Sequence, residues 1–172
     1  MYSARIKALY EEYNDLIAFC RANNQVSFEM YINDTYRKTL LLSAASYFES
    51  IITNAIHNYA REISKQNDEI VSFIDNKAIN RQFHTYFDWD KNNANQFFKL
   101  FGDTFKEKAR LLIKSNGLEE AERIFLSIGH ERNCLVHQNY IEYQINGTFE
   151  EIYAKYQVAC GFIECIVQLF ST

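Results

Sequence analysis

The sequence contains no proline, although it has 172 residues, and it contains only five glycines. Average usage of about 5% would place roughly nine prolines in a chain of this length. Proline disrupts helices strongly, and proline and glycine are the usual residues of tight turns. The composition therefore favours an all-α fold over collagen-like, linker-like or turn-rich β structure.

The remaining composition is that of a folded domain. Apolar residues make up 48% of the chain and charged residues 23%, which argues against disorder. A chain of this size can bury roughly 70% of its unfolded surface, enough for one core. A net charge of −4 argues against a generally basic nucleic-acid-binding surface, although a local basic patch is compatible with it. We expect one domain that spans residues 1–172.

Membrane and secretory segments are not expected. No apolar stretch approaches the ~18 residues of a membrane-spanning helix, and the N-terminal segment lacks the apolar core of a secretory signal. The four cysteines are scattered along the chain, which favours reduced thiols over a disulfide framework. We therefore expect a cytoplasmic protein without a membrane partner.

Apolar residues recur at helical spacing along most of the chain. The longest stripe, which includes Leu41, Phe48 and Ile52, is wide enough for a central helix with neighbours on several sides. We predict a helical bundle with two long helices, several short helices and no significant sheet. The expected helices cover residues 2–22, 34–65 (or 27–65 if unbroken), 69–76, 104–116, 118–128 and 148–170.

Local signals mark the ends of some of these helices. Thr148 and Glu151 have the spacing of a capping box at the start of the last helix, and Thr104 and Glu107 repeat this pattern earlier in the chain. Gly129 is expected to weaken the helix that precedes it, because glycine is a poor helix former.

Three polar residues close together carry the strongest chemical signal. Arg132, Asn133 and His137 place a fixed cation, an amide and a titratable imidazole within six residues. On a helix Asn133 and His137 share a face, and the long side chain of Arg132 can bend toward the same region. Histidine exchanges a proton near neutral pH, and arginine binds phosphate oxygens in bidentate fashion. The trio suits a phosphodiester; the alternative is a surface arginine with a half-buried histidine.

Glu49 lies on the apolar side of the long predicted helix, between Ala45, Ile52 and Ile56. An unpaired carboxylate in such a place is strongly unfavourable, so we expect a partner, and Arg132 is the natural candidate. A buried ion pair would fix the motif helix, or it would orient Arg132 for chemistry. Both interpretations remain open.

Metal-binding patterns are incomplete. His130 begins a zincin-like motif, but Cys134 stands where the second histidine should be. Cys134 and His137 could join Cys160 and Cys165, but the last spacing is not that of a zinc finger. We therefore expect no metal and no cofactor.

The most basic stretch of the chain includes Lys106, Lys108 and Arg110. Such a run is usually a solvated helix face, and the alternative is a surface that guides RNA phosphates. His57 and His84 are interpreted as structural histidines rather than catalysts.

The segment from Arg132 to His137 resembles the motif of the HEPN superfamily. That motif is an arginine, usually followed by Asn, Asp or His, and a histidine after four to six intervening residues. Glu49 resembles the acidic position on the preceding long helix of that family. The aromatic stretch over residues 84–101 is similar to the RiboL-PSP type of HEPN domain, and the resemblance covers residues 40–170.

The resemblance implies an all-helical domain that forms a homodimer, with the two motifs in a composite cleft. It also implies a metal-independent endoribonuclease that cleaves RNA by transesterification. Arg132, Asn133 and His137 would be catalytic, and Glu49 would support them. Active members are often toxins or effectors in bacterial defence and toxin–antitoxin systems, with an antitoxin or effector partner. The alternatives are a catalytically inactive HEPN module that binds RNA or a protein, and a purely structural helical dimer.

Overall fold

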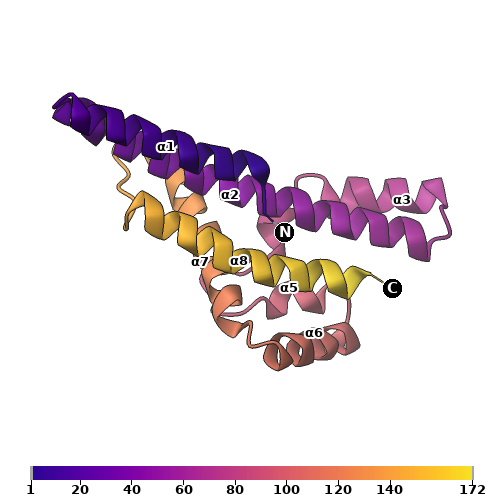
Figure 1. The fold of residues 1–172 in the computed structure, drawn as a ribbon. Coiled ribbons are helices and arrows are strands. Elements are labelled where there is room, and N and C mark those ends of the chain that lie inside the picture. Colours follow the sequence, from indigo (N-terminus) through magenta and orange to yellow (C-terminus); the bar gives the residue numbers. More distant parts are fainter. Residues whose placement is uncertain (1, 172) are drawn as a thin grey trace.

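The computed structural model describes residues 2–171 (Figure 1). In this part of the chain eight α-helices and one π-helical turn follow one another and no strand occurs, which confirms the all-α prediction. The elements are α1 (Ala4–Ala22), α2 (Val26–Ile63), α3 (Asp68–Ile74), the π-helical turn η1 (Asp75–Ile79), α4 (Phe83–Tyr86), α5 (Asn95–Lys99), α6 (Asp103–Ser115), α7 (Glu119–His137) and α8 (Phe149–Phe170).

The first two helices form a long antiparallel hairpin, in which α1 lies along the N-terminal part of α2 (Figure 1). Ser3 caps α1, because its hydroxyl accepts a hydrogen bond from the N–H of Ile6 at 3.4 Å. Asn24 makes the turn with a left-handed φ of +53°, which asparagine tolerates better than most residues. The second helix then runs unbroken for 38 residues from Val26, close to the earlier of the two expected starts.

The core lies where α2, α7 and α8 meet. The ring of Phe48 on α2 contacts Phe125 of α7 and Tyr156 of α8, each with a centroid separation of 5.7 Å. All three side chains are buried. The capping box predicted for α8 is confirmed, since Thr148 and Glu151 each accept a hydrogen bond from the other's backbone N–H. These contacts fix α7 and α8 against the long central helix.

The capping box predicted at Thr104 and Glu107 is not formed. The helix α6 begins one residue before Thr104, and its N-cap is Gly102, which has a φ of +95° and no capping side chain. Phe101 and Phe105 pack together across this turn with ring centroids 4.9 Å apart. The left-handed backbone of glycine permits the sharp turn that brings them into contact, so the helix begins earlier than the side-chain pattern indicates.

A buried carboxylate on α7 joins three elements. Glu122 is 1% exposed and forms a bidentate ion pair with Arg110 of α6, one bond of which measures 2.9 Å. The same carboxylate accepts a hydrogen bond from the backbone N–H of Ala94, just before α5, at 2.6 Å. Such a charge is stable in the interior only because both its oxygens are occupied.

No helix within residues 2–171 is long and apolar enough to cross a membrane. The four cysteines are free thiols: Cys20, Cys160 and Cys165 are buried and Cys134 is half-buried. Burial raises the pKa of the Cys165 thiol to about 11.

Candidate functional site

The predicted motif lies on the C-terminal half of α7, which continues through Gly129 and ends at His137. The expectation that Gly129 weakens this helix is therefore wrong. A Cβ at Gly129 would overlap the ring of Trp89, so glycine is required by a packing partner 40 positions away in sequence. The indole N–H of Trp89 donates to the carbonyl of His84 at 3.1 Å, which holds the ring in place.

The structure brings Arg132, Asn133 and His137 to one cleft, as their spacing predicts. Arg132 and Asn133 are half-buried, and His137, the last residue of α7, is exposed. Glu49 of α2 also borders the cleft. A fixed cation, an amide and an imidazole therefore line one hollow that is open to a ligand.

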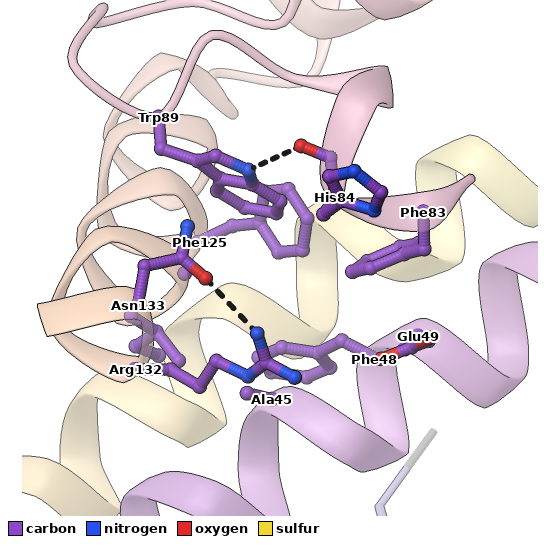
Figure 2. Close-up of a pocket in the computed structure, with 11 residues that line it drawn as sticks. Ala45, Phe48, Glu49, Phe83, His84, Trp89, Phe125, Arg132 and Asn133 are labelled. Carbon is purple, nitrogen blue, oxygen red and sulfur yellow. Dashed lines mark hydrogen bonds between the residues drawn. The ribbon is translucent and has the colours of Figure 1, made fainter. Parts of the chain in front are cut away.

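Asn133 orients Arg132 directly. Its Oδ1 accepts a hydrogen bond from the guanidinium Nη1 at 3.0 Å (Figure 2). Figure 2 shows these two residues on one side of the pocket and Phe83 and His84 on the opposite side. A guanidinium has five N–H donors, so this bond leaves donors free for phosphate oxygens.

The ion pair expected between Glu49 and Arg132 is not formed among the described residues. Glu49 is half-buried rather than buried, and both side chains line the same pocket without an ion-pair contact (Figure 2). The side chain of Glu49 reaches the edge of the apolar stripe, where water remains accessible. A carboxylate in this position needs no counter-charge, so the expected burial was wrong.

The three basic residues of α6 do not line the cleft. Lys108 is exposed and Lys106 is half-buried. Arg110 is occupied by Glu122, and its guanidinium also lies 5.1 Å from the ring centroid of Phe98. The charge of Arg110 is therefore engaged within the fold, where it holds α6 against α7.

Two cations of α2 fix the loop that follows the motif. Arg37 donates to the carbonyls of Ile145 and Gly147 at 3.2 Å and 3.1 Å. Lys38 is 2% exposed and donates to the carbonyl of Ile141 at 3.3 Å. Sequence reasoning missed both residues, because basic side chains on a helix are ordinarily solvated.

A tyrosine of the same loop is tied back to α7. The hydroxyl of Tyr143 donates to the carboxylate of Glu131 at 2.8 Å, one residue before Arg132. Burial, together with this hydrogen bond, raises the pKa of Tyr143 well above its ordinary value. The phenol therefore stays protonated at neutral pH and keeps the end of α7 in place.

Sequence reasoning also missed part of the opposite wall of the cleft. Arg81, Phe83 and His84 line it together with the motif residues. His84 was expected to be structural, but its side chain is exposed in this cleft. Its segment is rich in aromatic residues without helical period, so no pattern indicated which side chains face the motif.

Residues 2–171 contain no group of three or more side chains that could hold a metal ion. The Nδ1 of His130 lies 2.9 Å from a carboxylate oxygen of Asp90, and its Nε2 lies 3.5 Å from the sulfur of Cys134. The incomplete zincin-like pattern is thus accounted for by local contacts of α7.

The all-helical bundle and its Arg–His cleft define a HEPN-type domain. A family model described as RiboL-PSP-HEPN matches residues 7–172. The chain therefore belongs to the RiboL-PSP-HEPN family, which confirms the resemblance seen in the motif. HEPN domains are often related to ribonucleases, and they often bind RNA and dimerise. Neither the curated proteins nor the solved structures include a significant match.

Proposed function

We propose that this chain is a metal-independent endoribonuclease. The observation that carries the proposal is the cleft shared by Arg132, Asn133 and His137. Within residues 2–171 the imidazole of His137 has no hydrogen-bond or ion-pair partner, so it is available to a substrate. A group that transfers protons thus lies beside a cation that can stabilise developing negative charge.

The reaction is a transesterification within RNA. A base removes the proton of the ribose 2′-hydroxyl, the 2′-oxygen bonds to phosphorus, and the bond from phosphorus to the 5′-oxygen breaks. An acid then supplies a proton to that 5′-oxygen, which leaves a 2′,3′-cyclic phosphate and a 5′-hydroxyl. His137 performs one of the proton transfers, Arg132 stabilises the pentacovalent phosphate, and Asn133 holds Arg132.

The active form in this proposal is a homodimer in which two such clefts meet. Val136 and Ile141, one residue before and four residues after His137, are 51% and 84% exposed, and Tyr140 is also exposed. A group of apolar side chains around a polar site is typical of an interface. Light scattering reports whether the 20.3 kDa chain doubles in mass.

The biological role proposed is that of a cytoplasmic toxin or effector in a bacterial defence or toxin–antitoxin system. Membership in the RiboL-PSP-HEPN family supports this role. A ribonuclease that needs no cofactor cannot be regulated through cofactor supply. An antitoxin or effector partner would inhibit its activity instead. Lys106 and Lys108 remain candidate contacts for the outer part of the RNA.

The experiment is cleavage of end-labelled RNA by the purified chain in the presence of EDTA. Arg132→Ala is expected to lower the rate by ~10²–10³-fold, as for an oxyanion-type donor. His137→Ala is expected to lower it by ~10²–10⁴-fold, as for a general acid or base. Both variants should keep the melting temperature of the wild type, because neither side chain joins helices.

The matched controls are Arg123→Ala and His57→Gln. Arg123 is exposed on the same helix and pairs with Glu120, and His57 pairs with Asp75 away from the cleft. Both should cleave like the wild type. A folded wild type that binds RNA or a protein tightly without cleaving would favour the inactive module. Unfolding of the Arg132 or His137 variants would make the motif structural.

A further inference from the structure

Within residues 2–171, two of the four histidines are engaged by carboxylates and two are not. His57 pairs with Asp75 at 2.8 Å and His130 pairs with Asp90 at 2.9 Å. Among residues 2–171 the imidazoles of His84 and His137 have no such partner. These two unpaired imidazoles line the same cleft, and both also line the neighbouring hollow beside Trp89.

The backbone around His84 is fixed although its side chain is exposed. Its carbonyl accepts the indole N–H of Trp89 at 3.1 Å, and the carbonyl of Thr85 accepts from the Gln96 side chain at 2.9 Å. The next residue, Tyr86, donates its hydroxyl to the carbonyl of Ala78 at 2.5 Å. The position of the His84 backbone is thus fixed, and its imidazole is accessible from the cleft and makes no hydrogen bond within residues 2–171.

Arg81 adds to this wall a cation that has no ion-pair partner within residues 2–171. It is exposed, lines the cleft with Arg132, and has a left-handed φ of +60°. Non-glycine residues are uncommon in this conformation, which in this chain also occurs at turns outside the cleft, such as Asn24 and Lys65. The turn after η1 therefore directs a cation to the cleft edge that faces the motif.

We propose that His84 is a second acid–base residue of this site and that Arg81 is a second phosphate-binding cation. The inference rests on the proposed ribonuclease function and deepens it. One imidazole accepts the 2′-hydroxyl proton as the 2′-oxygen bonds to phosphorus. The other donates a proton to the 5′-oxygen as its bond to phosphorus breaks. The proton gained by the first residue equals that lost by the second, and water restores both.

This assignment places both proton-transfer groups in one protomer. A motif histidine alone provides one such group per chain, so a complete site would otherwise need both protomers. The charged and titratable groups that face His84 are mixed in sign. Three groups are acidic (Glu49 of α2, Asp88 and Asp90), two are basic (Arg81 and Arg132), and three on α7 are titratable (His130, which contacts Asp90, Cys134 and His137).

The test of His84 is His84→Gln, compared with His137→Ala and with His57→Gln as the control. The Trp89 contact is made to the backbone of His84, so the substitution should not change the melting temperature. His84→Gln should lower the single-turnover rate by ~10²–10⁴-fold and remove one limb of a bell-shaped pH profile. His57→Gln should retain both limbs.

A substrate with sulfur in place of the leaving 5′-oxygen identifies the acid. A thiol with a pKa of about 8.5 leaves without protonation. The variant that lacks the acid should therefore cleave this RNA at a rate close to that of the wild type. Recovery of either His84→Gln or His137→Ala supports the pair and assigns the roles. Recovery of neither, or a His84→Gln rate within twofold of the wild type, overturns the assignment while the ribonuclease function stands. A wild type that cleaves no RNA overturns both.

Arg81 is tested by the salt dependence of RNA binding in the His137→Ala background, which is a readout independent of cleavage. The logarithm of the RNA-binding constant falls linearly with the logarithm of the salt concentration. Loss of one phosphate contact in Arg81→Gly should make this slope less steep by about 0.7. Lys65→Gly is the matched control, because Lys65 is also exposed, has a φ of +54°, and does not line the cleft. Glycine adopts both conformations without strain. An unchanged slope in Arg81→Gly overturns the phosphate contact.

Discussion

The two halves of α7 differ in what engages their charged side chains. In the N-terminal half Glu122 is 1% exposed, and Arg110 and the backbone of Ala94 occupy its carboxylate. In the C-terminal half Arg132 bonds only to the neighbouring Asn133 among described side chains, and His137 has no partner. In the first half Glu122 joins helices, whereas in the second half Arg132 and His137 stay available to a ligand beside His130 and Glu131, which Asp90 and Tyr143 engage.

The difference teaches how one helix can serve stability and chemistry together. The helix is continuous through Gly129, so the position of the fixed half determines the position of the motif. Trp89 packs on the backbone at this junction and also lines the pocket beside Arg132. Substitution of Glu122 in the first half should therefore change stability, and substitution of Arg132 or His137 in the second half should change rate.

The largest stability effect is expected from Glu122→Gln. The substitution leaves the guanidinium of Arg110 without its counter-charge, and loss of one member of a buried pair typically costs about 3–5 kcal/mol. Urea unfolding measures the change. Glu120→Gln is the control, since Glu120 is exposed on the same helix and its pair with Arg123 should be worth less than about 1 kcal/mol. Equal losses in both variants would contradict the special role of Glu122.

The next largest stability effect is expected at alkaline pH, near the N-terminal half of α7. Cys165 of α8 lies near Arg110 and Glu122, and burial raises its pKa from 9.0 to about 11. The folded state binds this proton more tightly than the unfolded state does. The contribution of the protonated Cys165 thiol to the free energy of unfolding is therefore fully present below pH 9. It is lost as the pH rises toward 11, at about 1.4 kcal/mol for each unit of pKa shift.

Urea unfolding of the wild type and of Cys165→Ala between pH 8 and pH 11 provides the measurement for this titration. The stability advantage of the wild type should shrink across that range. A constant difference between the two proteins would contradict the assignment, because it would mean that Cys165 keeps its ordinary pKa in the folded state.

Gly129→Ala tests the junction between the halves. The new methyl group would overlap the ring of Trp89, and overpacking of this kind typically costs about 1–3 kcal/mol. Displacement of Trp89 should also lower cleavage, because the ring lines the pocket beside Arg132. Gly161→Ala on α8 is the control: its Cβ would meet Leu118 at 3.5 Å, an ordinary contact, so this variant should be as stable as the wild type or more stable. Equal melting temperatures for both variants would argue against close packing of Trp89 on Gly129.

The sequence predicts the parts of this fold that depend on local pattern. The long stripe around Phe48, the capping box at Thr148 and the spacing of Arg132 and His137 each depend on neighbours along the chain. The periodicity therefore indicates the long helices, and the motif indicates the family.

The parts that sequence reasoning missed depend on distant partners. Glu122 is stable in the interior because Arg110 and the backbone of Ala94 bind its carboxylate there. Glycine is required at position 129 because the ring of Trp89 packs against it. No local pattern shows that His84 is free whereas the other non-motif histidines are paired with aspartates. Such roles become visible only once the chain has been placed in three dimensions.

The smallest stability effect is expected from Glu49→Gln, although this residue borders the same cleft as Arg132. A buried ion pair between the two would predict a loss of about 3–5 kcal/mol. Because Glu49 is half-buried and makes no such pair, we expect a change within about 0.5 kcal/mol in urea unfolding. Glu49 lines the same cleft as Arg132, so cleavage should fall by less than about tenfold, the equivalent of about 1.4 kcal/mol in the barrier. A fall in stability as large as that of Glu122→Gln would show that the two residues pair in solution, and it would remove the distinction between the fixed and the available charges.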